Sequence, residues 1–218
     1  MANQVDDRRE EPDSERSRAE MSGAEQRRAP RVTLVIRMAK LIADGHEYFC
    51  IIRDVSATGV KVRIFHPLPR HETLLLELGN GDRYPVEQVW RTSDHMGFRF
   101  NDEVDVQSVI HETHGPFPRR QLRLGIALDA RVYSGCESCT VALHDISQQG
   151  ACIECEKRLL INELVRIETN GLPTVYAKVR WRRPPRYGLV FEQTFRLDEL
   201  ARMLAPMQMS EAPEQASR

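Results

Sequence analysis

The sequence predicts a mainly β protein made of two small six-stranded antiparallel β-barrels, each followed by a short C-terminal helix. The first observation is an internal repeat: Asp54 and Asp145 begin the same Asp-x-Ser-x-x-Gly motif 91 residues apart, and Trp90 and Trp181 have the same offset. A fixed offset of this length indicates two copies of one small domain. The second observation is that each copy contains short apolar runs separated by turn signals, without crossover helices, a pattern typical of small antiparallel barrels.

The first copy supplies six predicted strands and one predicted helix. Asp44-Gly45 is a hairpin signal. Asn80-Gly81 predicts a second turn. The segment 59–64 alternates apolar and polar residues, which is the period of a half-buried strand. The predicted strands are 32–43, 48–55, 59–64, 73–78, 83–91 and 96–100, and the predicted helix is 104–114.

The second copy repeats this order after a short connector rich in proline and glycine, 114–118. The predicted strands are 125–133, 139–145, 150–155, 163–169, 174–182 and 187–192, and the predicted helix is 197–204. The domain organisation that we expect is a disordered N-terminal tail at 1–24, a first domain at 25–114, a second domain at 115–205 and a disordered C-terminal tail at 206–218.

Composition excludes several functional classes. The 31 basic and 32 acidic residues leave a formal net charge of −1, which argues against a protein that lives by non-specific nucleic-acid binding. No stretch approaches the roughly 18 apolar residues of a membrane span, and the N-terminal segment lacks the apolar core of a secretory signal. We therefore expect a cytoplasmic protein, in which disulfides among the five cysteines are improbable.

The repeated polar residues are the candidate functional site. Arginines stand just before the first strand of each copy, and arginine pairs bidentately with phosphate and with the edge of guanine. In the Asp-x-Ser-x-x-Gly motif the carboxylate can accept hydrogen bonds from guanine, the hydroxyl can add another, and glycine lets a ring approach. A turn-forming role is the simpler interpretation, with glycine at positive φ, but the motif is six residues long, more than a tight hairpin needs.

Together, an Arg-x-x-x-Arg and an Asp-x-Ser-x-x-Gly after the second strand of a six-stranded barrel resemble the PilZ domain, a bacterial receptor for cyclic di-GMP. The resemblance covers 25–114 and 116–205 and implies two ligand sites. The residues that it carries over to the first site are Arg27, Arg31, Asp54, Ser56 and Gly59. Those that it carries over to the second site are Arg119, Arg123, Asp145, Ser147 and Gly150.

Other features are weighed against simpler explanations. Cys136, Cys139, Cys152 and Cys155 have the spacing of a structural zinc site. The first copy lacks them, however, and Cys152 and Cys155 should point to opposite faces of one strand, so we expect no metal. Trp90 and Trp181 could stack on a base, but a core position is the interpretation that burial in small barrels favours. No catalytic set recurs between the copies, so no enzyme and no cofactor are expected.

The sequence therefore predicts a non-enzymatic receptor for cyclic di-GMP. Arg27 and Arg31 adjoin the N-terminal tail, whereas Arg119 and Arg123 adjoin the connector, so ligand should order the tail at one site and fix the interdomain orientation at the other. Two alternatives remain: an adaptor that docks proteins without ligand, and a zinc-stabilised nucleic-acid-binding protein. A downstream protein partner is expected, and neither nucleic acid nor membrane insertion is.

Overall fold

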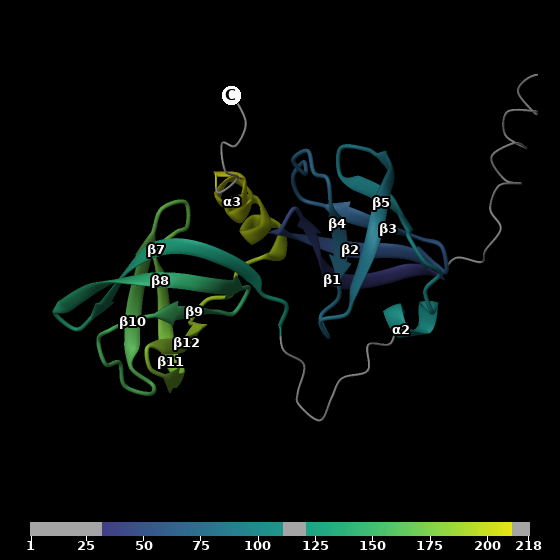
Figure 1. The fold of residues 1–218 in the computed structure, drawn as a ribbon. Helices are drawn as coiled ribbons and strands as arrows, with labels where there is room; N and C mark the ends of the chain where they lie inside the picture. Colours follow the sequence, from purple (N-terminus) through teal and green to yellow (C-terminus); the bar gives the residue numbers. More distant parts are fainter. Residues whose placement is uncertain (1–31, 111–120, 211–218) are drawn as a thin grey trace, which may run out of the picture. The chain divides into compact units, whose positions relative to one another are not determined.

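The computed structural model describes residues 32–110 and 121–210, with the backbone alone at 32–35 and 209–210, and contains two closed antiparallel barrels of six strands each (Figure 1). In the first barrel the strands neighbour one another in the order β1-β2-β3-β6-β5-β4. Its elements are β1 (Val32–Ala43), β2 (His46–Ser56), β3 (Gly59–Ile64), β4 (Leu74–Glu77), β5 (Arg83–Arg91), β6 (His95–Phe100) and the helix α2 (Val106–Ile110).

The second barrel has the same topology, β7-β8-β9-β12-β11-β10, and is coloured from green to yellow in Figure 1. Its elements are β7 (Leu124–Ser134), β8 (Glu137–Ser147), β9 (Gly150–Glu154), β10 (Leu164–Thr169), β11 (Val175–Arg183), β12 (Arg186–Phe191) and the helix α3 (Leu197–Ser210). The predicted fold class and the order of elements are therefore confirmed.

The helices depart from prediction at their ends. Helix α3 continues six residues beyond Leu204, through Pro206, to Ser210. Proline removes one backbone hydrogen bond inside the helix, but Leu204 and Ala205 are buried there, and this burial favours continuation. The predicted end of the first helix, 111–114, lies outside the described residues, as do both predicted tails apart from 206–210. Among the described helices, none is long and apolar enough to cross a membrane.

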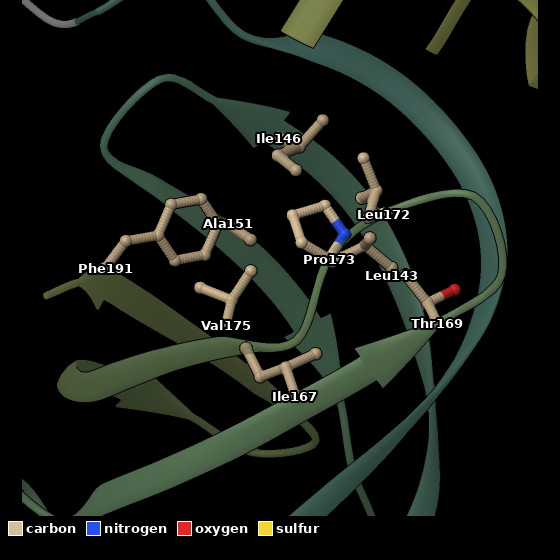
Figure 2. A pocket seen from close by; sticks show the side chains of 9 residues that line it. All are labelled: Leu143, Ile146, Ala151, Ile167, Thr169, Leu172, Pro173, Val175 and Phe191. Carbon is tan, nitrogen blue, oxygen red and sulfur yellow. The ribbon is translucent and has the colours of Figure 1, made fainter. Parts of the chain in front are cut away.

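The barrel interiors are filled by alternate residues of each strand. In β3, for example, Val60, Val62 and Ile64 are buried, while the residues between them are more exposed. Small closed barrels of this kind have room for side chains and little else. Figure 2 shows the end of the second barrel, where nine residues converge around a cavity of about 10 Å³. Such a volume is no more than one water molecule needs, and Thr169 is the lining's one polar residue, so this cavity is too small for an organic ligand.

The Asp-x-Ser-x-x-Gly motif forms a tight two-residue hairpin, and the prediction of a longer turn was wrong. Ser56 pairs with Gly59 across the first hairpin, and Ser147 pairs with Gly150 across the second. The aspartate and serine thus belong to the end of one strand, and the glycine begins the next. The carbonyl groups of the two turn residues accept hydrogen bonds from the last residue of the sixth strand and from a backbone N–H four residues later, at 2.8–3.0 Å in both barrels.

The motif glycines are required by a close approach of strands. Gly59 and Gly150 are not among the residues with positive φ, so the expected conformational reason was wrong. A Cβ at Gly59 would lie 2.8 Å from the carbonyl oxygen of Phe98 in β6. A Cβ at Gly150 would overlap the carbonyl oxygen of Leu189 in β12 still more severely. Because the obstacle is backbone, neither site can relax by moving a side chain.

We expect Gly150→Ala to lower the free energy of unfolding of the second barrel by about 1–3 kcal/mol, since the methyl group must push β9 and β12 apart. Gly59→Ala should cost less because the approach is looser. Urea unfolding followed by circular dichroism measures both, with the exposed Ser138→Ala in β8 as the control. Wild-type stability in Gly150→Ala would show that the close approach does not explain this glycine.

Candidate functional site

The motif aspartates are turned to the outside of each barrel by a β-bulge. The register between β2 and β3 shifts between Ile52 and Asp54. The register between β8 and β9 shifts at the equivalent place, between Leu143 and Asp145. A bulge inserts one extra residue and re-aims the side chain that follows it. Ile52 and Leu143 therefore point into the core, while the aspartates are half-buried at the surface.

A second bulge in each barrel places a tryptophan on the same outer surface. The register shifts between Gln88 and Trp90 in the first barrel and between Val179 and Trp181 in the second. The indole groups retain 40% and 39% of their exposure, so the expectation that they are core residues was wrong. A large aromatic ring that stays half-exposed next to polar residues offers a face on which a planar ligand can stack.

Each tryptophan lies over a glycine of the neighbouring strand. A Cβ at Gly97 would overlap the indole nitrogen of Trp90, and a Cβ at Gly188 would overlap that of Trp181. The glycine therefore lets the ring lie against the backbone of the sixth strand. This packing was not predicted from the sequence. The repeated seven-residue interval was the signal that could have revealed it.

The aspartate and the tryptophan are the two ends of one row across four strands. In the second barrel the paired residues are Asp145, Cys152, Gly188 and Trp181. In the first barrel they are Asp54, Lys61, Gly97 and Trp90. Three steps between neighbouring strands span roughly 14 Å. The row thus has a carboxylate at one end, an aromatic face at the other and a glycine between them.

One motif arginine is described, and it binds the motif aspartate. Nη1 of Arg123 donates a hydrogen bond to Oδ1 of Asp145 over 2.6 Å. The two side chains remain 38% and 29% exposed, so a ligand can reach both. The ion pair holds the guanidinium group at the head of the row. Arg27, Arg31 and Arg119 lie outside the described residues.

The motif serines stabilise the hairpins. Oγ of Ser147 donates a hydrogen bond to the carbonyl oxygen of Gly150, and Oγ of Ser56 does the same with Gly59. Both serines are buried. In the first barrel the N–H of Gly59 also donates to Oγ of Ser56. The hydroxyl groups are therefore engaged inside the turn, and this geometry explains the fixed Ser-x-x-Gly spacing.

The two rows differ in charge. Lys61 lies where the second barrel has Cys152, and the next pair is Arg63 with His95 in the first barrel but Glu154 with Arg186 in the second. Glu154 is shared: it accepts a hydrogen bond from His144 at 2.9 Å, and lies 3.6 Å from Arg186. Burial and the charge of Asp145 raise the pKa of the Cys152 thiol, so this member of the second row stays neutral.

The structure brings two of the four clustered cysteines together. Sγ of Cys139 lies 3.4 Å from Sγ of Cys155, and both side chains pack at the second core. Burial and the neighbouring Cys139 raise the pKa of Cys155 to about 11. Cys152 belongs to the outer row instead, and Cys136 is exposed. The described part of the chain contains no group of three or more histidine, cysteine or acidic residues placed to hold a metal ion.

Comparison with solved structures finds proteins that match most of this chain and one that matches less than half of it. The PlzA protein of Borreliella burgdorferi, solved with c-di-GMP, is 10% identical, with a TM-score of 0.34, and the match covers 86% of this chain and 98% of that one. The motility inhibitor MotI/DgrA of Bacillus subtilis is 13% identical over 81% of this chain and 98% of that one, with a TM-score of 0.34. The PilZ domain of CeSA from a cellulose-synthesizing bacterium is 18% identical over 41% and 98%, with a TM-score of 0.32.

These scores are low, and the structural likeness adds no argument of its own. No curated protein matches the sequence. The model of the PilZ domain, however, matches twice, over residues 25–113 and 117–205, which together make up most of the chain. The repeated motifs, the two closed barrels and this double match lead to one conclusion: the chain belongs to the PilZ domain family, with two copies of the domain in tandem.

Proposed function

We propose that this protein is a non-enzymatic receptor for cyclic di-GMP with one binding site on the outer surface of each barrel. The observation that carries the proposal is the arrangement in the second barrel. There, the ion pair of Arg123 and Asp145 begins a row that ends at the exposed ring of Trp181. Many PilZ domains bind this ligand, and PlzA, one of the similar proteins, is described in complex with it.

The chemistry of the second row suits a guanine nucleotide. The carboxylate of Asp145 accepts hydrogen bonds from the N1–H and the exocyclic amine of guanine. Arg123 donates to a phosphate oxygen or to the O6 and N7 edge of guanine, and its charge strengthens each bond. Trp181 offers a stacking face for a base. Gly188 has no side chain and so leaves space on the surface between Asp145 and Trp181. Ser147 and Gly150 then act by fixing the hairpin that presents Asp145.

The first site follows by the internal repeat. Asp54 and Trp90 occupy the same register positions as their counterparts in the second barrel. The sequence motif adds Arg27, Arg31 and Arg119 to the proposed sites. Ser56 and Gly59 shape the first hairpin. Lys61 adds a cation to the first row, which favours the phosphates of the ligand.

We also propose that the two sites have different consequences. The arginines of the first site adjoin the N-terminal segment, and those of the second adjoin the connector between the barrels. Ligand at the first site then orders the segment before β1, at a cost of about 1–2 kcal/mol per fixed residue. Ligand at the second site draws the connector onto the second barrel and restricts the orientation of the domains. A cytoplasmic protein with a downstream protein partner fits this role.

A protein-docking adaptor is the second candidate, in which the barrels serve as docking surfaces and the ligand sites are vestigial. The intact motifs in both copies favour the receptor. A zinc-stabilised nucleic-acid-binding protein finds less support, because the two cysteines in contact are half of the ligands that a closed zinc site requires.

Titration of cyclic di-GMP into wild type, Arg31→Ala and Arg123→Ala by calorimetry tests the proposal. We expect each variant to weaken one site by roughly 10- to 150-fold, the equivalent of losing a hydrogen bond to a charged group. Arg131→Ala, an exposed arginine in β7 outside the row, serves as the control and should bind as wild type does. No heat with the wild-type protein would support the adaptor and overturn the receptor.

The two tryptophans provide an optical test that separates the sites. The chain has two tryptophans, and each barrel contributes one of them to its row. We expect cyclic di-GMP to quench Trp181 in the Trp90→Phe variant and Trp90 in the Trp181→Phe variant, because a guanine stacks on the remaining indole. Quenching in the first variant should disappear when Arg123→Ala is added. Unchanged fluorescence at saturating ligand would remove the tryptophans from the proposed site.

Small-angle scattering tests the proposed effect of the second site. In the Arg31→Ala background, ligand should narrow the distribution of interatomic distances, because the connector becomes ordered. The same background with Arg123→Ala is the control and should scatter identically with and without ligand. An unchanged profile despite calorimetric binding at the second site would contradict the proposed change in domain orientation.

A further inference from the structure

Exposed apolar side chains gather on one face of the second barrel. Among the described residues nine large hydrophobic side chains are exposed, and six of them belong to the second barrel. One of the six, Trp181, is part of the candidate ligand site. The other five are in β10, β11, β12 and the loop before β10: Leu160, Ile161, Leu164, Tyr176 and Val190.

The strand register places three of these residues around Lys178. Leu164 in β10 pairs with Lys178 in β11, and Lys178 pairs with Val190 in β12, so the three form one row. Tyr176 lies in the next row, paired with Arg166. Directly paired side chains in a sheet have Cβ atoms about 4.5–5.5 Å apart. Leu164, Tyr176 and Val190 keep 49%, 51% and 44% of their exposure, so three exposed apolar side chains surround Lys178.

The first barrel shows that the fold does not require this apolar face. The positions of Lys178 and Val190 are occupied there by Glu87 and Arg99, which pair across the same strands and form an ion pair at 2.5 Å. Tyr176 corresponds to Pro85. An ion pair on an exposed sheet face discourages docking of another chain, because both charges would have to be desolvated. The second barrel carries apolar groups where the first carries that pair.

The same hairpin also carries uncompensated positive charge. Residues 175–191 contain five lysines and arginines and no carboxylate, whereas the matching residues 84–100 contain two arginines and two carboxylates. Lys178 lies 3.5 Å from Glu192 and Arg186 lies 3.6 Å from Glu154. Arg180, Arg182 and Arg183 are exposed and have no ion pair recorded within the described ranges: Arg180 lies at the bulge beside Trp181, and the others lie at the tip of the hairpin.

We propose that Leu164, Tyr176, Lys178, Arg180 and Val190 form a docking surface, the β10–β12 face, for a protein segment that presents apolar side chains flanked by carboxylates. Tyrosine and arginine are enriched at protein interfaces, where the ring supplies buried area and the guanidinium group supplies a directed ion pair. The apolar side chains at the centre of the β10–β12 face contact the apolar side chains of the partner. The exposed arginines of the hairpin form ion pairs with the carboxylates of the partner.

Two other occupants fit less well. Nucleic acid would use the arginines, but its phosphates would leave Leu164, Tyr176 and Val190 without apolar partners, and the net charge of −1 opposes a polyanion. A second copy of this chain, docked symmetrically, would bring the same cations against one another. Charge complementarity therefore selects an acidic, partly apolar protein segment.

The test transfers the surface of the first barrel onto the second. The double variant Lys178→Glu with Val190→Arg recreates the Glu87–Arg99 pair at the same register, so the barrel has a precedent for folding with it. A second variant, Arg180→Glu with Arg182→Glu, reverses the charge and leaves the apolar side chains in place. Arg131→Glu in β7 is the matched control for adding negative charge elsewhere. Thermal unfolding by circular dichroism confirms that each variant is folded.

The probe is a fluorescein-labelled peptide of alternating glutamate and leucine, measured by anisotropy against the full chain without cyclic di-GMP. The result is then independent of the proposed receptor function. We expect binding that weakens about tenfold in both variants and not in Arg131→Glu. A matching lysine–leucine peptide should not bind. A random peptide display library selected on the wild type should enrich acidic and apolar residues together, and this enrichment should disappear on the Lys178→Glu, Val190→Arg variant.

Three results would overturn the proposal. The first is equal binding of the peptide to wild type and to both variants. The second is binding of duplex or single-stranded DNA that depends on Arg180 and Arg182 and exceeds binding of the peptide. The third is self-association in sedimentation velocity that the Lys178→Glu, Val190→Arg variant abolishes, which would assign the β10–β12 face to a second copy of this chain.

Discussion

The closed barrel is the constraint on which the rest of the structure depends. Six tilted strands enclose a space that side chains fill, and the cavity of about 10 Å³ in the second barrel leaves no room for a nucleotide. The proposed recognition of a nucleotide therefore uses the outer surface, where a regular strand presents every second side chain. The bulges before Asp145 and Trp181 provide what regular strands cannot: they turn one polar and one aromatic side chain outward at the two ends of a row.

The internal repeat and the alternating apolar residues were enough to predict both barrels and all twelve of the described strands. Local patterns could not reveal features that depend on pairing between strands. A bulge is visible only in the register of two strands, so the exposure of Trp90 and Trp181 was mispredicted from their size. The reason for Gly59 and Gly150 also lies in another strand, in the carbonyl groups of Phe98 and Leu189. The motif was recognisable although its physical explanation was not.

Comparison of the two barrels separates what the fold needs from what each copy has acquired. The hairpin hydrogen bond of the serine, the close approach of the glycine and the stacking of tryptophan over glycine recur in both, so they belong to the scaffold. Other positions differ between the copies. Lys61 of the first barrel is replaced by Cys152 in the second, and the Glu87–Arg99 ion pair is replaced by Lys178 and Val190. Substitutions at equal positions of one fold change the surface chemistry without changing the strand pairing. The different roles proposed for the two barrels rest on these positions.

The two proposed surfaces of the second barrel share one hairpin, and this sharing has a thermodynamic consequence. Trp181 and Gly188 belong to the ligand row, while Lys178 and Val190, a few residues away on the same strands, belong to the β10–β12 face. A ligand with two phosphates adds negative charge beside Arg180 and Arg186, and so lowers the positive potential that an acidic partner requires. Thermodynamic linkage makes the effect reciprocal: a partner that neutralises these arginines lowers the affinity for the ligand by the same factor. Coupling of this kind needs no change of conformation, because a rigid hairpin places both binding surfaces within one electrostatic field.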